Sequence, residues 1–157
     1  MSRKTIQTVV VDTSVFADYY FFYSKKPERH ERARAVLDKL SSLGLLVYEP
    51  FLFEVELRAV LVRRIKPEQA LEIVGIVLRH VNVIGEELIH DKAAEIALFT
   101  GCRAVDAYYI ATAKYVNAVL VTNDKAMKYN ASKAGTEVYY LLNDEDYKAL
   151  TSKLIIS

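Results

Sequence analysis

Five short runs of apolar, mostly β-branched residues recur along the chain, and segments with helical spacing lie between them. The runs are Val9–Val11, Leu45–Val47, Val81–Ile84, Val119–Val121 and Val138–Leu142. Continuous apolar runs of this length are typical of strands that are buried on both faces of a parallel sheet. The pattern therefore predicts five strands of this buried type.

Two of the intervening helices have clear starts. Pro27-Glu28 opens a segment that stops at Gly44, and Pro67-Glu68 opens a second one, as expected for proline in a first helical turn. Further helices are expected over residues 51–64, 88–99, 105–117, 125–132 and 144–153. Strands that alternate with helices predict a three-layer α/β fold. With no linker or repeat, residues 1–157 are expected to form a single domain.

Composition says more about the cellular compartment of the protein than about its function. The formal net charge of +1, from 21 Lys and Arg against 20 Asp and Glu, predicts no strongly basic surface for nucleic acid. Cys102 is the single cysteine, and the first residues lack the apolar stretch of a signal peptide or membrane anchor. We expect a reducing, cytoplasmic setting and no membrane. The three histidines lie far apart in sequence, which disfavours a zinc site.

Acidic residues follow the apolar runs. Asp12 ends the first run in Val-Val-Val-Asp-Thr-Ser, and Asp124 follows the fourth in Val-Leu-Val-Thr-Asn-Asp. Ligands of parallel α/β sheets bind beyond the carboxyl ends of the strands, so both acids are expected at one edge. Glu56 falls early in the helix after the second run, and Asp106 opens another helix. We therefore predict that these four carboxylates converge.

Each acid also has an ordinary structural interpretation. Asp12, Asp106 and Asp124 precede helical segments, where aspartate commonly caps free N–H groups. Glu56 alone is typical of a solvated helix residue. Capping explains each helix start, but it does not explain why the acids share one sheet edge, so both interpretations stay open on sequence pattern alone.

Converging carboxylates would repel one another unless a cation neutralised them. Carboxylate oxygens are hard ligands, which favours Mg²⁺ or Mn²⁺. Such an ion lowers the pKa of a water molecule and stabilises charge on a phosphodiester, which is hydrolytic nuclease chemistry. Two other classes fit less well. An aspartyl phosphatase usually has a second Asp two positions after the first, where this chain has Ser14, and a nucleotide-binding domain needs a glycine-rich loop that the sequence lacks.

Four motifs resemble those of PIN domains, especially VapC-type toxin ribonucleases. They are Val-Val-Asp-Thr-Ser, Pro50 followed by Glu56-Leu57, Val-Asp-Ala-Tyr-Tyr-Ile-Ala-Thr-Ala and Leu-Val-Thr-Asn-Asp. They occur in family order from residue 9 to residue 124, and the last 30 or so residues are less diagnostic. The resemblance implies an α/β/α fold with a central parallel sheet of about five strands. It also implies an Mg²⁺ or Mn²⁺ site and cleavage of single-stranded RNA to a 5′-phosphate and a 3′-hydroxyl, often by a homodimer bound to a small antitoxin.

On this resemblance, Asp12, Asp106 and Asp124 correspond to the metal-binding acids, helped by Glu56. Glu54 is an alternative to Glu56, but two helical positions differ by about 200°, so only one of them can face the site. Glu56 is preferred for its distance from Pro50.

Polar residues beside the acids have two interpretations each. The resemblance makes Ser14 and Thr122 supporting residues, whose hydroxyls would hold a carboxylate or a metal-bound water; the alternative is local backbone capping. Asn123 is an equally ordinary turn residue. Arg103 would meet a phosphate or neutralise the acids, and it stays outside the core assignment.

Two further segments suggest contact surfaces. The aromatic run 19–23 is expected to serve packing and partner contact more than base stacking. The helix from Pro67 to His80 has a wider apolar surface than one buried stripe needs, which suits a dimer or antitoxin interface, although a covered core helix is also possible. Two alternatives to a toxin ribonuclease remain: a catalytically idle PIN fold that acts as a binding or scaffold module, and an RNA-processing nuclease.

Overall fold

The computed structural model describes residues 5–156 and contains one five-stranded sheet in which every strand pairing is parallel. The strand order is β3-β2-β1-β4-β5. The strands are β1 (Thr8–Val11), β2 (Leu46–Pro50), β3 (Asn82–Ile84), β4 (Val119–Thr122) and β5 (Val138–Tyr140). The predicted central parallel sheet is confirmed.

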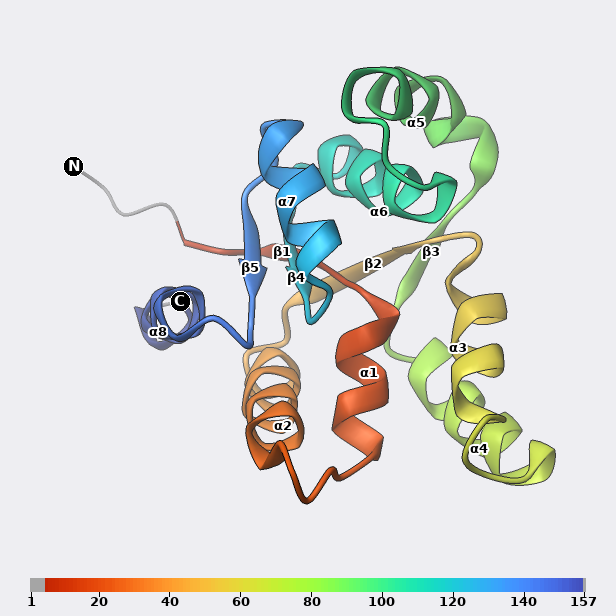
Figure 1. Cartoon of the computed structure of the whole chain (residues 1–157), viewed down its shortest axis with the longest axis vertical. Coiled ribbons are helices and arrows are strands. Elements are labelled where there is room, and N and C mark those ends of the chain that lie inside the picture. The colour runs from red at the N-terminus through yellow and green to blue at the C-terminus, as the bar shows by residue number, and fades with distance from the viewer. Residues whose placement is uncertain (1–4, 157) are drawn as a thin grey trace.

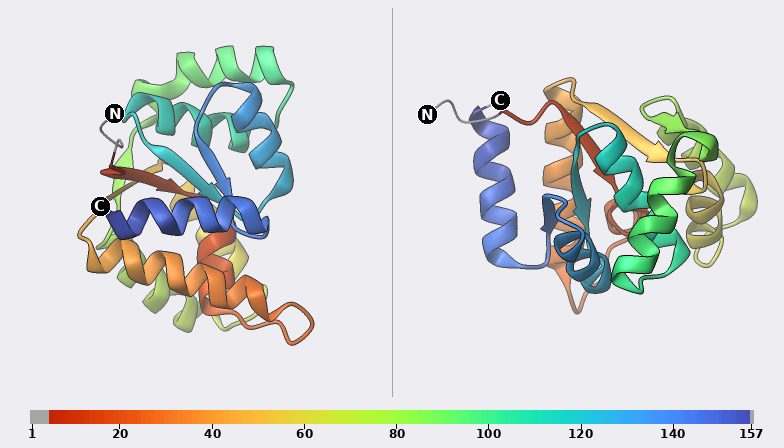
Figure 2. Two further views of the ribbon diagram at one scale, coloured as in Figure 1. Left: turned by 90° about the vertical axis from the view of Figure 1, so that its left-hand side faces the viewer. Right: turned by 90° about the horizontal axis from the view of Figure 1, so that it is seen from above.

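Helices cover both faces of this sheet, which confirms the predicted three-layer arrangement (Figures 1 and 2). On one face α6 packs against the sheet, with α5 outside it and α7 beside it. On the other face lie α1, α2 and α8, while α3 and α4 extend the layer beyond α1. The helices are α1 (Thr13–Tyr20), α2 (Pro27–Ser42), α3 (Phe53–Leu61), α4 (Pro67–Leu78), α5 (Glu86–Thr100), α6 (Ala104–Tyr115), α7 (Lys125–Lys133) and α8 (Asp144–Ile156).

The central strands are the most deeply buried part of the sheet. Val9, Val10 and Val11 of β1 and all four residues of β4 are buried, as expected for strands that helices cover on both faces. The expectation of two-sided burial is wrong for β3, because this three-residue edge strand exposes Asn82 and Val83. An edge position needs no apolar residue on its open side.

Helix α1 begins directly after the first strand, and no range was predicted for it, although the capping interpretation of Asp12 implied a helical segment there. Its residues, Thr-Ser-Val-Phe-Ala-Asp-Tyr-Tyr, include β-branched and aromatic types with low helix propensity. Five of its first six positions are buried, and they lie on all sides of the helix. The sequence therefore shows no single apolar stripe with helical spacing. The helix depends on its packing against α2 and α3, which is a case of tertiary contacts overriding local preference.

The strand order reverses between β1 and β4. The chain passes from β1 outward to β2 and β3, and then returns to the other side of β1 to form β4 and β5. Ligand sites of open α/β sheets lie at the carboxyl ends of the two strands that flank such a reversal. The residues that follow β1 and β4 are therefore the ones to consider first.

Candidate functional site

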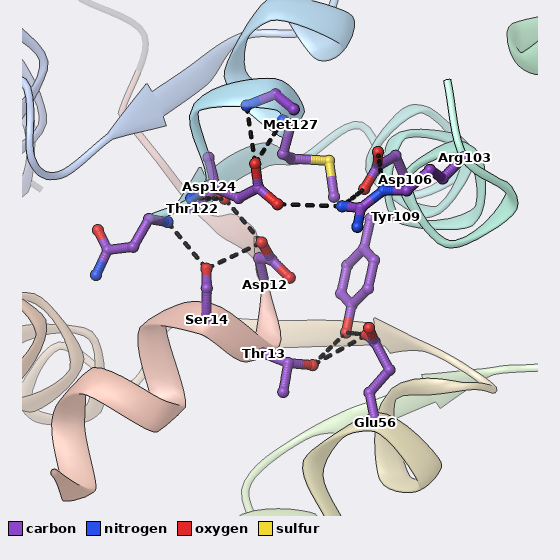
Figure 3. Close-up of polar contacts among 12 residues, drawn as sticks. Asp12, Thr13, Ser14, Glu56, Arg103, Asp106, Tyr109, Thr122, Asp124 and Met127 are labelled. Carbon is purple, nitrogen blue, oxygen red and sulfur yellow. Dashed lines mark hydrogen bonds and ion pairs between the residues drawn. The ribbon is translucent and has the colours of Figure 1, made fainter. Parts of the chain in front are cut away.

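Asp12 lies at the carboxyl end of β1, at this reversal point. Its backbone N–H donates to the carbonyl of Val121 in β4 (2.9 Å), and its side chain is only 6% exposed. The hydroxyls of Ser14 and Thr122 both donate to Asp12 Oδ2, at 2.9 and 2.8 Å. These bonds fix the carboxylate, and Figure 3 shows its other oxygen pointing toward the side on which Tyr109 and Asp106 lie.

The same hydroxyls join the ends of the two strands. Ser14 Oγ also accepts the N–H of Asn123 (3.0 Å), and Thr122 Oγ1 accepts the N–H of Asp124 (2.9 Å). Each hydroxyl therefore donates to Asp12 and accepts from the loop after β4. The polar residues beside the acids hold a carboxylate and organise the backbone at once, so the two interpretations of Ser14 and Thr122 do not exclude each other.

Burial raises the pKa of Asp12 from 3.8 to about 6. The hydrogen bonds from Thr122 and Ser14 oppose this rise, while the charges of Glu56 and Asp124 add to it. The negative charge of Asp12 is therefore costly in this environment without a nearby cation.

The two carboxylate oxygens of Asp124 have different roles. Oδ1 caps helix α7 by accepting the N–H groups of Ala126 (2.8 Å) and Met127 (3.3 Å), as the capping interpretation predicts. Oδ2 faces the opposite way and contacts the guanidinium of Arg103 (Figure 3). Asp12, by contrast, is the N-cap residue of α1 but makes no side-chain capping bond, because both of its described side-chain bonds are to hydroxyls.

Arg103 lies between two of the predicted metal ligands. Its Nη2 is 3.1 Å from Asp106 Oδ1 and 3.1 Å from Asp124 Oδ2, and its Nε adds a 3.2 Å bond to Asp106 Oδ2. Asp106 is buried in the first turn of α6, whereas the Arg103 side chain is 69% exposed. An exposed cation thus neutralises two acids that would otherwise repel each other.

Glu56 lies on the β2 side of the site. Its Oε1 lies 2.7 Å from the Tyr109 hydroxyl and 3.1 Å from the Thr13 hydroxyl, and the two hydroxyls are 2.6 Å apart, so two protons serve three contacts (Figure 3). Glu54 instead forms an ion pair with Arg58 one helical turn later, on the outside of α3. The structure thus answers the question that the sequence left open, because Glu56 faces inward and Glu54 faces solvent.

Sequence reasoning missed several polar residues around the acids. Thr13 and Tyr109 contact Glu56 through their hydroxyls, and Tyr109 is fully buried. Asp18 accepts from Asn123 Nδ2 (2.7 Å) and pairs with Arg29. Glu49, at the end of β2, is also fully buried. The strand-end rule that selected Asp12 would have selected Glu49 too.

The donors present are of the type that a hard divalent cation prefers, and two of them meet at one point. Asp106 and Asp124 direct one oxygen each at the same cationic nitrogen, and Asp12 lies beside them (Figure 3). Within residues 5–156, no group of three or more His, Cys, Asp or Glu side chains is arranged as a ready metal site. Arg103, whose side chain is exposed, occupies the place between Asp106 and Asp124.

The chain was compared with models of protein families and with known proteins. A model of the PIN domain matches residues 9–133, which include all four acids. The search of curated proteins returned no match.

Several solved structures share the fold at low sequence identity. FitAcB from Neisseria gonorrhoeae aligns with a TM-score of 0.63 and 21% identity over 86% of this chain and 99% of that one. VapBC-1 from nontypeable Haemophilus influenzae aligns with a TM-score of 0.64 and 16% identity over 87% and 99%. PAE2754 from Pyrobaculum aerophilum gives 0.64 and 17% over 97% and 91%. At these identities the likeness concerns the fold.

Proposed function

This chain belongs to the PIN-domain family, and from this premise we propose that it is an Mg²⁺- or Mn²⁺-dependent endoribonuclease that hydrolyses single-stranded RNA. PIN domains are nucleases and generally use divalent metal ions. The observation that carries the proposal is the convergence of Asp106 and Asp124 on one cationic nitrogen, 3.1 Å from each, beside the buried Asp12. Acids with this geometry favour a cation over separate capping roles.

In the proposed site, Asp12, Asp106 and Asp124 hold the ion. A bound Mg²⁺ or Mn²⁺ supplies a water of lowered pKa and stabilises negative charge on the phosphodiester. Ser14 and Thr122 keep the Asp12 carboxylate in one orientation through their bonds to Oδ2. Glu56, held by Tyr109 and Thr13, is the fourth acid and adds its negative charge on the β2 side.

Arg103 changes its partner in this mechanism. To hold the ion, Asp106 and Asp124 would have to release the Arg103 guanidinium, because it occupies the same carboxylate oxygens. The side chain, 69% exposed, would then be available to bind a non-bridging oxygen of the RNA phosphate.

We further propose that the chain is the toxin of a toxin–antitoxin pair, that it forms a homodimer, and that a small antitoxin protein binds it. The structures of VapBC and FitAB complexes with the same fold support this proposal. Helix α4 exposes about half of the Leu71 and Ile76 side chains, so apolar surface is available for a protein contact. In the described part of the chain, no helix has the length and apolar content needed to cross a bilayer.

The test is cleavage of a labelled single-stranded RNA by the purified protein in Mg²⁺, Mn²⁺ or EDTA, beside single-stranded DNA and duplex RNA of the same sequence. Asp12→Asn and Asp106→Asn should lower the cleavage rate at least about 100-fold while retaining the circular dichroism spectrum. Asp91→Asn is the matched control, because Asp91 lies exposed on α5. The products should carry 5′-phosphate and 3′-hydroxyl ends.

Cleavage that persists in EDTA, or that survives both substitutions, would contradict the proposal. A folded wild type that neither cuts RNA nor binds Mn²⁺ would favour an idle binding module. The toxin role is tested by expressing wild type and Asp106→Asn in bacteria: growth arrest by the wild type alone is expected, and equal growth would favour RNA processing.

A further inference from the structure

The ladder between β1 and β2 stops just before the site. Its paired register ends at Val10↔Tyr48, whereas β1 and β4 remain paired through Val11↔Val121. The next rung between β1 and β2 would need an N–H donor at residue 50. Pro50 has none, so the carbonyl of Val11 lacks its usual backbone donor on β2.

The side chain of Glu49 provides a link at this point. The backbone N–H of Val11 donates to Glu49 Oε1 at 3.0 Å. Val11 is the residue before Asp12, and the opposite edge of β1 is held by the bond from the Asp12 N–H to β4. The end of β1 is therefore fastened on the β4 side by backbone and on the β2 side by a carboxyl group.

Glu49 is an unusual group to bury. Its side chain is 0% exposed, and Oε2 has no hydrogen-bond partner among the residues that the structure describes. Burial raises the pKa of Glu49 well above its usual value, and the nearby charges of Asp12 and Glu56 raise it further. An ionised carboxylate is therefore costly at this position. The charge of an ionised Glu49 would also act on Tyr109. Burial makes the largest contribution to the raised pKa of Tyr109, and Glu49 makes the next largest.

An apolar residue of similar size would fill the same space and remove the unpartnered Oε2, although it would also remove the oxygen that accepts from Val11. Buried polar groups without partners cost stability, and replacing them with well-packed apolar residues is often neutral or stabilising. Departures of this kind are expected at functional sites, where stability is given up for geometry. Glu49 contacts Val11, the residue before Asp12. It is also close enough to Glu56 and Tyr109 for their charges to interact.

We propose that Glu49 is a positioning residue of the acidic site: its carboxyl group holds the end of β1 so that Asp12 faces the same point as Asp106 and Asp124. The inference rests on the proposed nuclease function, since it assigns Glu49 a part in building that site. Glu49 itself contacts neither the cation nor the RNA in this proposal.

Two substitutions separate positioning from simple packing. Glu49→Gln has a neutral side chain with an oxygen that accepts from Val11. It should therefore keep the thermal midpoint of the wild type, and its Mn²⁺ affinity and turnover should stay within about twofold of wild type. Glu49→Met keeps the length but has no oxygen. We expect its thermal midpoint to equal or exceed that of wild type, while the Val11 amide exchanges hydrogen about fivefold faster, as for the loss of one hydrogen bond.

The decisive readouts are the Mn²⁺ dissociation constant, from electron paramagnetic resonance, and the separate values of kcat and KM. In Glu49→Met the dissociation constant should rise about tenfold or more, as for loss of a residue that orients a metal ligand, and kcat should fall while KM changes little. A well-folded Glu49→Met protein with wild-type Mn²⁺ affinity and kcat would overturn the inference. So would a Glu49→Gln protein as defective as the Met variant.

The two proposals fail in different ways. If the nuclease proposal is wrong, the wild type itself does not cut RNA, and the inference is then judged on Mn²⁺ binding. If only the inference is wrong, the wild type cuts RNA and the Met variant matches it.

Discussion

The guanidinium of Arg103 contacts Asp124 at 3.1 Å, although 21 residues separate them in sequence, and the same nitrogen contacts Asp106. The fold thus places an exposed cation where the proposed metal ion would bind. Arg103 and the ion must compete for the same carboxylates, since two cations cannot share this place without repulsion.

We predict that Arg103→Gln binds Mn²⁺ about two- to fivefold more tightly than the wild type, because the metal no longer has to displace an ion pair worth up to about 1 kcal/mol. In EDTA the variant should be less stable, since Asp106 and Asp124 lose their counter-ion. Isothermal titration and thermal denaturation measure the two effects.

Arg58→Gln is the matched control for this prediction, because Arg58 pairs with Glu54 on the outside of α3. It should change neither quantity. Weaker Mn²⁺ binding by Arg103→Gln would show that Arg103 helps to build the site instead of competing for it.

Glu56 and Glu54 allow a paired test of the inward-facing acid. Glu56→Gln should lower RNA cleavage about 10- to 100-fold, the range seen when a partner of a metal site is lost, because its carboxylate lies at the hydroxyls of Thr13 and Tyr109. Glu54→Gln should retain activity within about twofold. Equal losses in both variants would argue that the charge of α3, not the position of one acid, matters.

The buried Asp12 should make the metal-free protein less stable as pH rises. Burial raises its folded-state pKa from 3.8 to about 6, so between pH 4 and 6 the folded protein keeps a proton that the unfolded chain releases. Ionisation then favours the unfolded chain, and the cost is fully present above pH 6, where it reaches about 3 kcal/mol. Below pH 4 it vanishes.

Urea denaturation in EDTA at pH 4 to 7, for the wild type and Asp12→Asn, measures this cost. The variant lacks the titrating group. As pH rises over this interval, its free energy of unfolding should therefore increase relative to that of the wild type. A constant difference between the two proteins would contradict the raised pKa.

Thr122→Val should destabilise the protein by about 1–3 kcal/mol. The substitution removes a buried hydroxyl that donates to Asp12 and accepts from the N–H of Asp124, so two groups lose a partner at once. Urea denaturation at pH 7 gives the free energy of unfolding. In the control, Thr112→Val, a buried hydroxyl bonded only to the Tyr108 carbonyl is lost, and a cost below about 1 kcal/mol is expected.

Much of the architecture followed from local pattern. The apolar runs identified all five strands, and proline fixed the starts of α2 and α4 at the residues observed. The bounds of helix α1 could not be predicted, because its buried positions surround the helix and its residues have weak helical preference. The end of β2 was also missed: Pro50 belongs to the strand, although proline usually argues against a strand interior.

The sequence by itself determined which residues carry charge at the strand ends, because the order of apolar runs and acids is a local property of the chain. It predicted that Asp12 and Asp124 share one edge, since parallel strands bring their carboxyl ends together. Only the tertiary structure decided that Arg103 lies between Asp106 and Asp124, that Glu56 faces inward, and that Glu49 reaches Val11. These relationships depend on how helices pack on the sheet and on where a ladder of hydrogen bonds stops, and neither is encoded by the spacing of residues along one segment.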